Sequence, residues 1–191
     1  DEGQQNYKAE FDRQTVWFSV DQGVQPPAPP PVESLAPGET TLQFIDVRTL
    51  AGTDDTQLGY YFAIAGESPA WRGALIELSL DGGQNYVDSR AERLQTIMGT
   101  LVDDLPAHAR EFPDAQNTVT VDITTHGGSL EAATLADMMN RKNRALIGDE
   151  IVCFGDVDEI SPGRWQIDYF LRGRLGSPIT AHGAGERFVL L

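Results

Sequence analysis

Short apolar stretches with strand character recur along most of the chain. They are rich in β-branched and aromatic residues, several alternate apolar with polar positions, and Gly, Ser and Pro separate them. The strand candidates are residues 14–20, 41–47, 59–65, 73–80, 94–100, 118–124, 150–155, 164–172 and 187–190. Strands about 8 to 15 residues apart are typical of sandwiches and barrels. The pattern therefore predicts a mainly β protein, a barrel or sandwich of about nine strands.

One short helix is expected after Ser129. Ser is a favourable N-cap residue, and residues 130–139 carry a broad, imperfect apolar stripe. The preceding residues 126–128, His-Gly-Gly, superficially resemble the glycine-rich oxyanion loop of esterases. The chain has no Gly-x-Ser-x-Gly elbow and no alternation of strands and helices, so the hydrolase interpretation is discarded. We expect these glycines to turn the chain from a strand into the helix.

A proline-rich run at residues 26–31 divides the chain. Its fixed φ angles and missing amide hydrogens favour an extended spacer of about 3 Å per residue, although such a run can also be a ligand for aromatic grooves. We predict a strand segment over residues 1–25 that belongs to a larger upstream domain, a linker over 26–37, and a β-rich domain over 38–191. The strand at 14–20 is expected to pair with missing upstream chain or with the later domain.

The chain is strongly acidic. Its 191 residues carry 29 acidic against 14 Lys and Arg side chains, a net charge of −15, and 40% of the residues are hydrophobic. That hydrophobic share suffices for a core. Because affinity for a phosphate backbone depends on clustered Lys and Arg, the charge argues against tight nucleic-acid binding. The charge is explained first by solubility, and a functional use of the repulsion is the second interpretation.

The chain contains one cysteine and no stretch resembling a membrane span. Cys153 lies in an apolar strand pattern and is expected to be a buried small hydrophobe in a protein folded in a reducing cytoplasm. No apolar run approaches about 18 residues, and the polar start is unlike a signal peptide. Since the chain does not begin with Met, we expect Asp1 to be an arbitrary boundary within a longer polypeptide.

The spacing of His and acidic residues in the sequence does not indicate a metal site or a catalytic centre. His108, His126 and His182 have no spacing that would place two ligands on one helix or strand face, and His108 is expected in a solvated loop. The carboxylates of residues 156–159 could bind calcium, but they lack the regular alternation of oxygen ligands around a Gly. We expect them to lie in solvent beside a hairpin that reverses at residues 161–163. No metal, cofactor or catalytic residue is predicted.

Two glycine-containing motifs are expected to be structural. Asp81-Gly82-Gly83 lies between two strand candidates and resembles the aspartate box of sialidases, which is structural there too; a hairpin turn explains it. Arg172-Gly173-Arg174 would place two guanidinium groups on one side of an extended chain. Such a pair could bind phosphate or carboxylate. In so acidic a chain, we expect it to tie the strand end to nearby Asp and Glu side chains, within the domain or across a subunit contact.

The order of these segments resembles the large tail-tip proteins of siphophages and gene transfer agents. The resemblance spans about residues 26–191 and is carried by the proline spacer, the motifs Leu-x-Phe-Ile-Asp, Gly-Tyr-Tyr, Trp-Arg-Gly-Ala, Asp-Gly-Gly and Leu-Arg-Gly-Arg, and the closing Phe-Val-Leu-Leu. It implies a virion structural protein without catalysis: a baseplate hub part at the tail tip, assembled in the host cytoplasm, that contributes to channel closure, host attachment and genome delivery. The implied partners are two further copies in a homotrimer, fibres, and other tail-tip and distal tail proteins.

Two rival functions stay open at this stage. The first is a carbohydrate- or receptor-binding module at the same location, which would contact a host glycan through Tyr60, Tyr61, Trp71 and Trp165, with Trp17 and Tyr86 as further candidates. Exposure of several of these rings on one surface would favour it, and burial would favour the scaffold. The second rival is a glycosidase fragment, which needs two facing carboxylates about 5 to 10 Å apart. In the tail-tip role, by contrast, DNA passing through the tail channel would contact the acidic channel wall only transiently.

Overall fold

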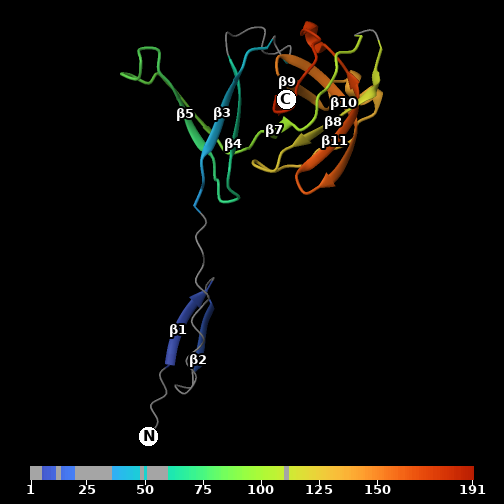
Figure 1. The fold of residues 1–191 in the computed structure, drawn as a ribbon. Coiled ribbons are helices and arrows are strands. Elements are labelled where there is room, and N and C mark those ends of the chain that lie inside the picture. Colours follow the sequence, from blue (N-terminus) through green and yellow to red (C-terminus); the bar gives the residue numbers. More distant parts are fainter. Residues whose placement is uncertain (1–5, 12–13, 20–35, 48–49, 51–59, 110–111) are drawn as a thin grey trace. The chain divides into compact units, whose positions relative to one another are not determined.

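The computed structural model describes residues 6–11, 14–19, 36–47, 50, 60–109 and 112–191, and its main feature is a closed β-barrel (Figure 1). The strands follow one another around the barrel in the order β10-β11-β8-β7-β12-β9, and every paired neighbour is antiparallel. Their bounds are Met98–Leu101 (β7), Asp114–Asp122 (β8), Arg144–Ile147 (β9), Glu150–Ser161 (β10), Arg164–Leu171 (β11) and Arg187–Leu190 (β12). The prediction of a mainly β barrel is confirmed.

The barrel has apolar residues on both of its faces. Ala145 and Ile147 of β9 point into the interior, whose buried side chains form the main core. Leu146 points outward, where Met98, Ile151 and Val189 join it in a second buried cluster. Because the side chains of a strand alternate between faces, the three residues of β9 that follow Arg144 are all apolar. The main core is formed by Leu101, Leu105, Val119, Val121, Ile123, Leu130, Ala145, Ile147, Val152, Phe154, Ile167, Phe170 and Phe188.

Two small sheets precede the barrel in the chain. The first pairs β3 (Thr40–Ile45) with β4 (Tyr61–Gly66), and the second pairs β5 (Ala74–Leu78) with β6 (Asp88–Glu92). The inner face of β3–β4 contributes Ile45, Ala63 and Ala65 to the second cluster and so covers the outside of the barrel. Twelve strands are described where about nine were expected. The sequence prediction missed β1, β6 and β9.

The short helix begins later than the sequence predicted. Helix α1 spans Leu135–Met139, and its N-cap is Thr134, whose hydroxyl accepts from the Asp137 amide while the Asp137 carboxylate accepts from the Thr134 amide. The prediction that Ser129 caps the helix is wrong. Leu130 is buried in the main core without being helical, and the amide of Ala133 donates to the carbonyl of Gly155. Tertiary burial of this segment therefore overrides its helical apolar pattern.

The β10–β11 hairpin reverses where the sequence predicted. Strand β10 ends at Ser161 and β11 begins at Arg164, with Gly163 at a φ of 73° in the turn. Asp156, Asp158 and Glu159 are exposed on β10. Among the described residues, no three His, Cys, Asp or Glu side chains are grouped so that they could hold a metal ion.

The N-terminal unit is a separate hairpin. The chain divides into residues 1–34 and 35–191, and in the first unit β1 (Asn6–Phe11) pairs with β2 (Gln14–Ser19). The expectation that the strand at 14–20 would pair with upstream chain or with the later domain is wrong, because its partner is the segment just before it. Most of the predicted linker lies outside the described residues. No helix in the described part of the chain has the length and hydropathy to cross a lipid bilayer.

Candidate functional site

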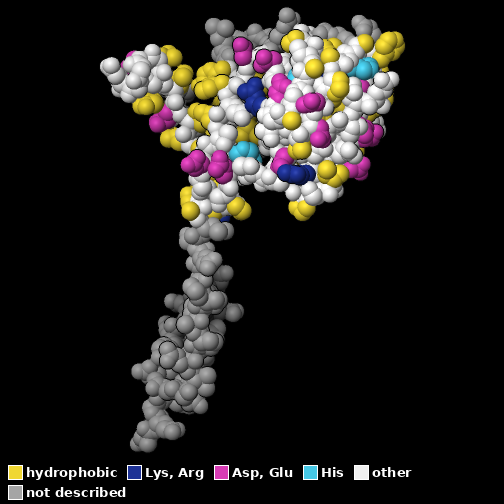
Figure 2. All heavy atoms as spheres, in the orientation of Figure 1, with side chains coloured by type: hydrophobic (Ala, Val, Ile, Leu, Met, Phe, Trp, Pro, Cys, Tyr) yellow, Lys and Arg dark blue, Asp and Glu magenta, His cyan; other side chains and the backbone are white. Residues whose placement is uncertain are grey.

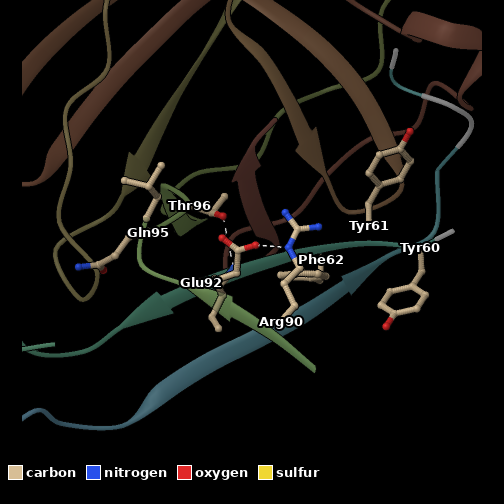
Figure 3. Close-up of a pocket in the computed structure, with 9 residues that line it drawn as sticks. Tyr60, Tyr61, Phe62, Arg90, Glu92, Gln95 and Thr96 are labelled. Carbon is tan, nitrogen blue, oxygen red and sulfur yellow. Dashed lines mark hydrogen bonds and ion pairs between the residues drawn. The ribbon is translucent and has the colours of Figure 1, made fainter. Parts of the chain in front are cut away.

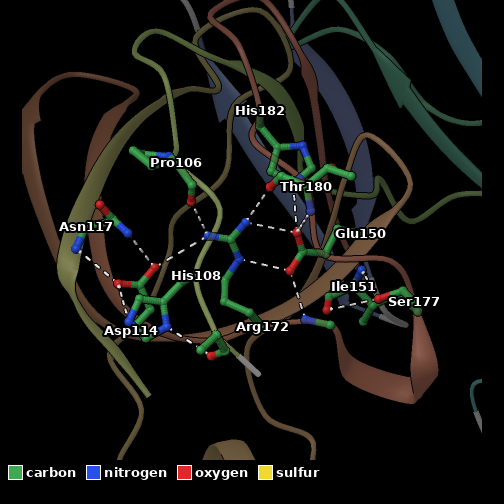
Figure 4. Close-up of polar contacts among 12 residues, drawn as sticks. Pro106, His108, Asp114, Asn117, Glu150, Ile151, Arg172, Ser177, Thr180 and His182 are labelled. Atoms are coloured by element: carbon green, nitrogen blue, oxygen red, sulfur yellow. Dashed lines mark hydrogen bonds and ion pairs between the residues drawn. The ribbon is translucent and has the colours of Figure 1, made fainter. Parts of the chain in front are cut away.

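A buried ionic network lies at one end of the barrel, centred on Arg172 (Figure 4). Its Nε and Nη2 bond the two carboxylate oxygens of Glu150, both at 2.9 Å. Nη2 also donates to the carbonyl of Thr180 at 2.9 Å. Nη1 donates to the carbonyl of Pro106 at 2.8 Å and to Asp114 at 3.4 Å. All five N–H groups of the guanidinium therefore have an acceptor, which offsets the cost of burying it.

Glu150 is the anion at the centre of the network. One carboxylate oxygen also accepts from the amide of Gly173 at 2.8 Å, and the other accepts from the amide of Thr180 at 3.3 Å and contacts Nε2 of His182 at 2.9 Å. The opposite ring nitrogen of His182 lies 3.1 Å from the carboxylate of Glu186. Glu150 thus joins the start of β10 to the end of β11 and to the loop before β12.

Asp114 extends the network to the start of β8. It accepts from the amides of Gln116 and Asn117 and from the side-chain amide of Asn117, the last at 2.8 Å. Nε2 of His108 lies 3.9 Å from it. Figure 4 shows Arg172 between the two carboxylates, so that one cation links β8, β10 and β11. The sequence led us to expect Arg172 and Arg174 to tie the strand end to acidic side chains, within the domain or across a subunit contact; for Arg172 those side chains are Glu150 and Asp114 of the same chain.

The electrostatics of the network favour its charged forms. Burial alone would raise the pKa of Glu150, but the hydrogen bonds from His182 and Arg172 and the charge of Arg172 outweigh it and lower the pKa to about 2. Burial opposes protonation of His182, yet its bonds to Glu150 and Glu186 dominate and raise its pKa above 6.5. The side chains of Arg172, Glu150 and Asp114 have no exposed surface and His182 has 1%. These four side chains are closed to solvent, so their bonds can fix the barrel end.

Arg174 does not join Arg172. The chain leaves β11 through Gly173 at a φ of 57° and enters a short 3-10 turn over Arg174–Gly176. Arg174 then lies near Cys153, whose pKa is raised by burial, with the charges of Arg174 and Arg144 opposing that effect. The expectation of two guanidinium groups on one side of an extended strand is wrong, because the left-handed Gly173 reverses the direction of the chain.

The Asp81-Gly82-Gly83 motif forms the loop between β5 and β6. The carboxylate of Asp81 accepts from the hydroxyl of Ser79, the amides of Gln84 and Asn85, and the side chain of Asn85. The hydrogen bonds from Asn85 are the largest cause that lowers its pKa to about 2. The two glycines have φ of 74° and 87°, which suits a tight reversal. This loop connects two antiparallel strands, as the sequence predicted.

The four candidate glycan aromatics do not share one surface. Trp71 is 6% exposed, and its indole N–H donates to the hydroxyl of Thr40 at 2.9 Å. Its ring packs directly on Gly66, where no side chain would fit. Trp165 packs against the main core of the barrel. Tyr61 packs against the second cluster, and its hydroxyl accepts from the amide of Leu50. Only Tyr60 of the four is exposed, so it alone is available for surface stacking.

Tyr60 lies at the rim of an open pocket with a volume of about 290 Å³ (Figure 3). Its ring centroid is 5.8 Å from that of Phe44 and 6.4 Å from that of Phe62. The guanidinium carbon of Arg90 lies 5.5 Å from the centre of the Phe62 ring, and its Nε is paired with Glu92. The lining residues are Tyr60, Tyr61, Phe62, Ile64, Arg90, Glu92, Leu94, Gln95 and Thr96. Sequence reasoning missed Arg90 and Glu92, because β6 itself was not predicted.

Two further titratable residues, His126 and Asp122, lie at the end of β8 and in the turn that follows it. His126 lines a second pocket of about 220 Å³ with Asp122 and Thr124, and its Nδ1 is 3.4 Å from the carbonyl of Gly66. Asp122 accepts from Thr124 and from Arg164, and these bonds lower its pKa. Its carboxylate is therefore engaged in holding the turn at the end of β8.

The chain matches one family of known proteins over part of its length. Residues 96–189 match the family described as Rcc01698-like, C-terminal. Rcc01698 is a gene transfer agent-associated protein. The match begins just before β7 and ends within β12, so it spans the six barrel strands. No curated protein matches the chain.

Proposed function

We propose that this chain is a structural part of a phage-like tail tip or baseplate hub. The observation that carries the proposal is the match of residues 96–189 to a family named after a gene transfer agent-associated protein. The motif order in the sequence points to the same class of assembly. In this role the barrel helps to close the tail channel and anchors fibres or receptor-binding parts, and genome delivery proceeds through the assembly.

The architecture supports a scaffold role. A closed barrel has no free strand edge, and its end is fixed by the fully buried Arg172–Glu150 pair. Such a part holds its shape while neighbouring proteins bind around it. We assign it no catalysis, and the buried charges at the barrel end serve to hold its strands together.

The acidic surface suits a channel through which DNA passes. Acidic side chains are scattered over the face of the barrel that Figure 2 shows, and Lys and Arg are few there. Wall carboxylates would keep the DNA backbone from adhering, because like charges repel and no cluster of cations replaces its counterions. We propose that part of this surface lines the channel of a homotrimer.

Cryo-electron microscopy of tailed particles from cells that encode this chain tests the proposal. A short epitope inserted between Gly82 and Gly83, in the exposed β5–β6 loop, would mark the chain for antibody labelling. We expect label only at the distal end of the tail, in three copies around the axis, and density for the barrel beside the channel. Label on the capsid, label along the tube, or particles without the chain would contradict the proposal. Particles with the untagged chain are the matched control.

A further inference from the structure

Strand β3 is the open edge of the β3–β4 sheet. The other side of β4 is covered by residues 94–96: the amide of Thr96 donates to the carbonyl of Ile64 at 2.8 Å, and the side chain of Gln95 accepts from the amide of Gly66 at 3.2 Å. No residue that the structure describes bonds in this way to the other side of β3. Within the described part of the chain, the sheet therefore ends at β3.

The register of the pair shows which backbone groups of β3 point toward the open edge. Ile64 directs its N–H and its C=O to Thr96, so it does not bond to the backbone of Leu42, the residue opposite it. Backbone groups alternate in direction along an antiparallel pair. Thr40, Leu42 and Phe44 therefore present three N–H donors and three C=O acceptors to a further strand.

The edge lacks the features that usually prevent the addition of a strand. β3 has the sequence Thr-Thr-Leu-Gln-Phe-Ile, without a charge, a proline or a glycine, and its six pairs with β4 follow one another without a bulge. Natural edge strands are commonly protected by charged residues, proline or bulges. The neighbouring hairpin has such protection, with Glu77 in β5 and Asp88, Arg90 and Glu92 in β6. Of these two hairpins, β3–β4 is the one suited to accept a strand.

The two faces of β3 indicate which side chains an added strand would carry. On the outward face Leu42 is 40% exposed and Phe44 is 59% exposed, so apolar side chains beside them would remove this area from water. On the other face Gln43 lines the pocket of about 220 Å³, and its Oε1 is buried without a hydrogen-bond partner among the described residues. An added residue beside Gln43 points to the same face, where a hydroxyl or amide group can donate to this oxygen.

We propose that β3 is a docking edge for an extended segment of a partner protein, in which apolar residues alternate with Ser, Thr or Asn and are flanked by Lys or Arg. The flanking charges follow from Glu39 and Asp46, which are exposed at the two ends of β3, and from the net charge of −15. A second copy of the chain fits less well. Two β3 strands paired around Leu42 would bring Glu39 of one copy next to Asp46 of the other at both ends.

Hydrogen exchange measured by NMR on the full 191-residue chain tests the inference. The probe is the synthetic peptide acetyl-Lys-Lys-Thr-Val-Thr-Ile-Thr-Val-Lys-Lys-amide. We expect it to bind and to slow the exchange of the Thr40, Leu42 and Phe44 amides at least about tenfold. The amides of Thr41 and Gln43 already point toward β4, so their exchange should change less than about twofold.

Two modified peptides separate strand addition from other kinds of binding. N-methylation of the Val and Ile residues removes the N–H groups that would face β3, while the side chains stay the same. Binding, measured by fluorescence anisotropy of labelled peptides, should weaken at least about tenfold. A peptide with Glu in place of the four Lys residues should also bind at least about tenfold more weakly, because Glu39 and Asp46 repel it.

A pair of variants locates the binding on the chain. Phe44→Lys places a charge on the edge and should weaken the Lys-flanked peptide at least about tenfold. Tyr86→Lys is the matched control and should leave binding unchanged, because Tyr86 is also 59% exposed but lies in the loop between β5 and β6. Circular dichroism of both variants checks that the fold is kept.

Several results would overturn the inference. They are absence of binding by the Lys-flanked peptide, equal binding by the N-methylated peptide, and equal loss in Tyr86→Lys. A concentration-dependent dimer in analytical ultracentrifugation that Phe44→Lys abolishes would assign the edge to a second copy, and would overturn it as well. The inference goes beyond the hub role and does not depend on it, since all of these measurements use the isolated chain and none bears on where the chain lies in a particle.

Discussion

The barrel and the two hairpins before it differ in how much of each sheet is buried. The barrel strands close on themselves, and the main core inside them is buried. The hairpins β3–β4 and β5–β6 are two-stranded sheets that leave Phe44, Tyr60 and Leu75 in solvent. A two-stranded sheet alone is marginal in water, whereas closure removes every edge. The inner face of β3–β4 packs on the outside of the barrel, so the hairpins differ from the barrel mainly in the face that stays in solvent.

The family match follows the same division. It spans residues 96–189, which contain β7 to β11 and nearly all of β12, and it includes neither hairpin. A scaffold shared with other proteins and a binding surface outside that match would be the expected arrangement for an attachment part. The following predictions test this comparison, beginning with the largest expected effect.

Removing the buried cation should cost more than any surface change. Arg172→Met leaves Glu150 and Asp114 buried without their partner, so we expect the free energy of unfolding to fall by about 3–5 kcal/mol. Urea unfolding followed by circular dichroism measures it. The matched control is Arg164→Ala at the start of β11, the strand that ends just before Arg172. The bond of Arg164 to Asp122 at 3.0 Å is partly exposed and should be worth at most about 1 kcal/mol. Equal losses in the two variants would show that the network does not fix the barrel.

The stability of the barrel should decline as the pH rises above about 6.5. The folded state raises the pKa of His182, so protonated His182 stabilises the fold fully below its unfolded pKa of 6.5, and this contribution is lost as the pH rises through the higher folded value. The melting temperature should therefore fall as the pH rises above 6.5, and the His182→Gln variant should lack that part of the slope. Differential scanning calorimetry at several pH values measures both. An unchanged slope in the variant would assign the pH dependence to other groups.

Glu150 gives the opposite sign at low pH. Its pKa is about 2 in the folded state against 4.5 unfolded, so its contribution is present above pH 4.5 and lost as the pH falls toward 2. We expect the melting temperature to decrease over that window. Glu150→Gln should flatten the decrease while lowering stability at neutral pH, because the amide cannot accept all the hydrogen bonds that the carboxylate accepts. A variant with the wild-type acid profile would assign acid sensitivity to another carboxylate.

Elements whose sequence pattern is local were predicted, whereas elements that form only by pairing with distant residues were missed. Residues 187–190, strand β11 and the turn before it were predicted nearly to the residue, because alternation and the Pro-Gly turn are local features, whereas β10 runs six residues beyond the predicted 150–155. Strand β6 was missed because Asp-Ser-Arg-Ala-Glu has no strand propensity and forms by its register with β5. The Arg90 wall of the pocket was missed with it.

The buried network shows the same limit more clearly. Arg172 carried a sequence signal, since a cation at a strand end of an acidic chain needs an anion. Glu150 and His182 are 32 residues apart, and no spacing rule joins them; closure of the barrel brings them together. Their pairing depends on the tertiary structure. The same holds for Leu130, which is apolar because it is buried in the main core and not because a helix begins there.

Helix capping should produce a smaller effect and separates the observed cap from the predicted one. Thr134→Ala removes the hydroxyl that accepts from Asp137 at 3.2 Å and should cost about 1 kcal/mol. Ser129→Ala is the matched control: Ser129 is exposed and not part of the helix, so its substitution should change stability by no more than about 0.5 kcal/mol. Thermal unfolding of both variants measures the difference. If Ser129→Ala lowered the stability more than Thr134→Ala, Ser129 would be the helix cap, as the sequence predicted.

The smallest effect is expected on the hairpins. Leu75 of β5 is 62% exposed, so Leu75→Ser removes little buried area and should change the free energy of unfolding by no more than about 0.5 kcal/mol. Its counterpart in the barrel, Ile147→Ala, empties a fully buried position and should cost about 2–5 kcal/mol. Urea unfolding of both gives the ratio. If Leu75→Ser destabilised the isolated chain by several kcal/mol, the hairpin would contribute to the core and the division between a stable barrel and a binding surface would fail. If instead it left stability intact but weakened assembly into particles, the exposed leucine would belong to a contact that forms only in the assembly.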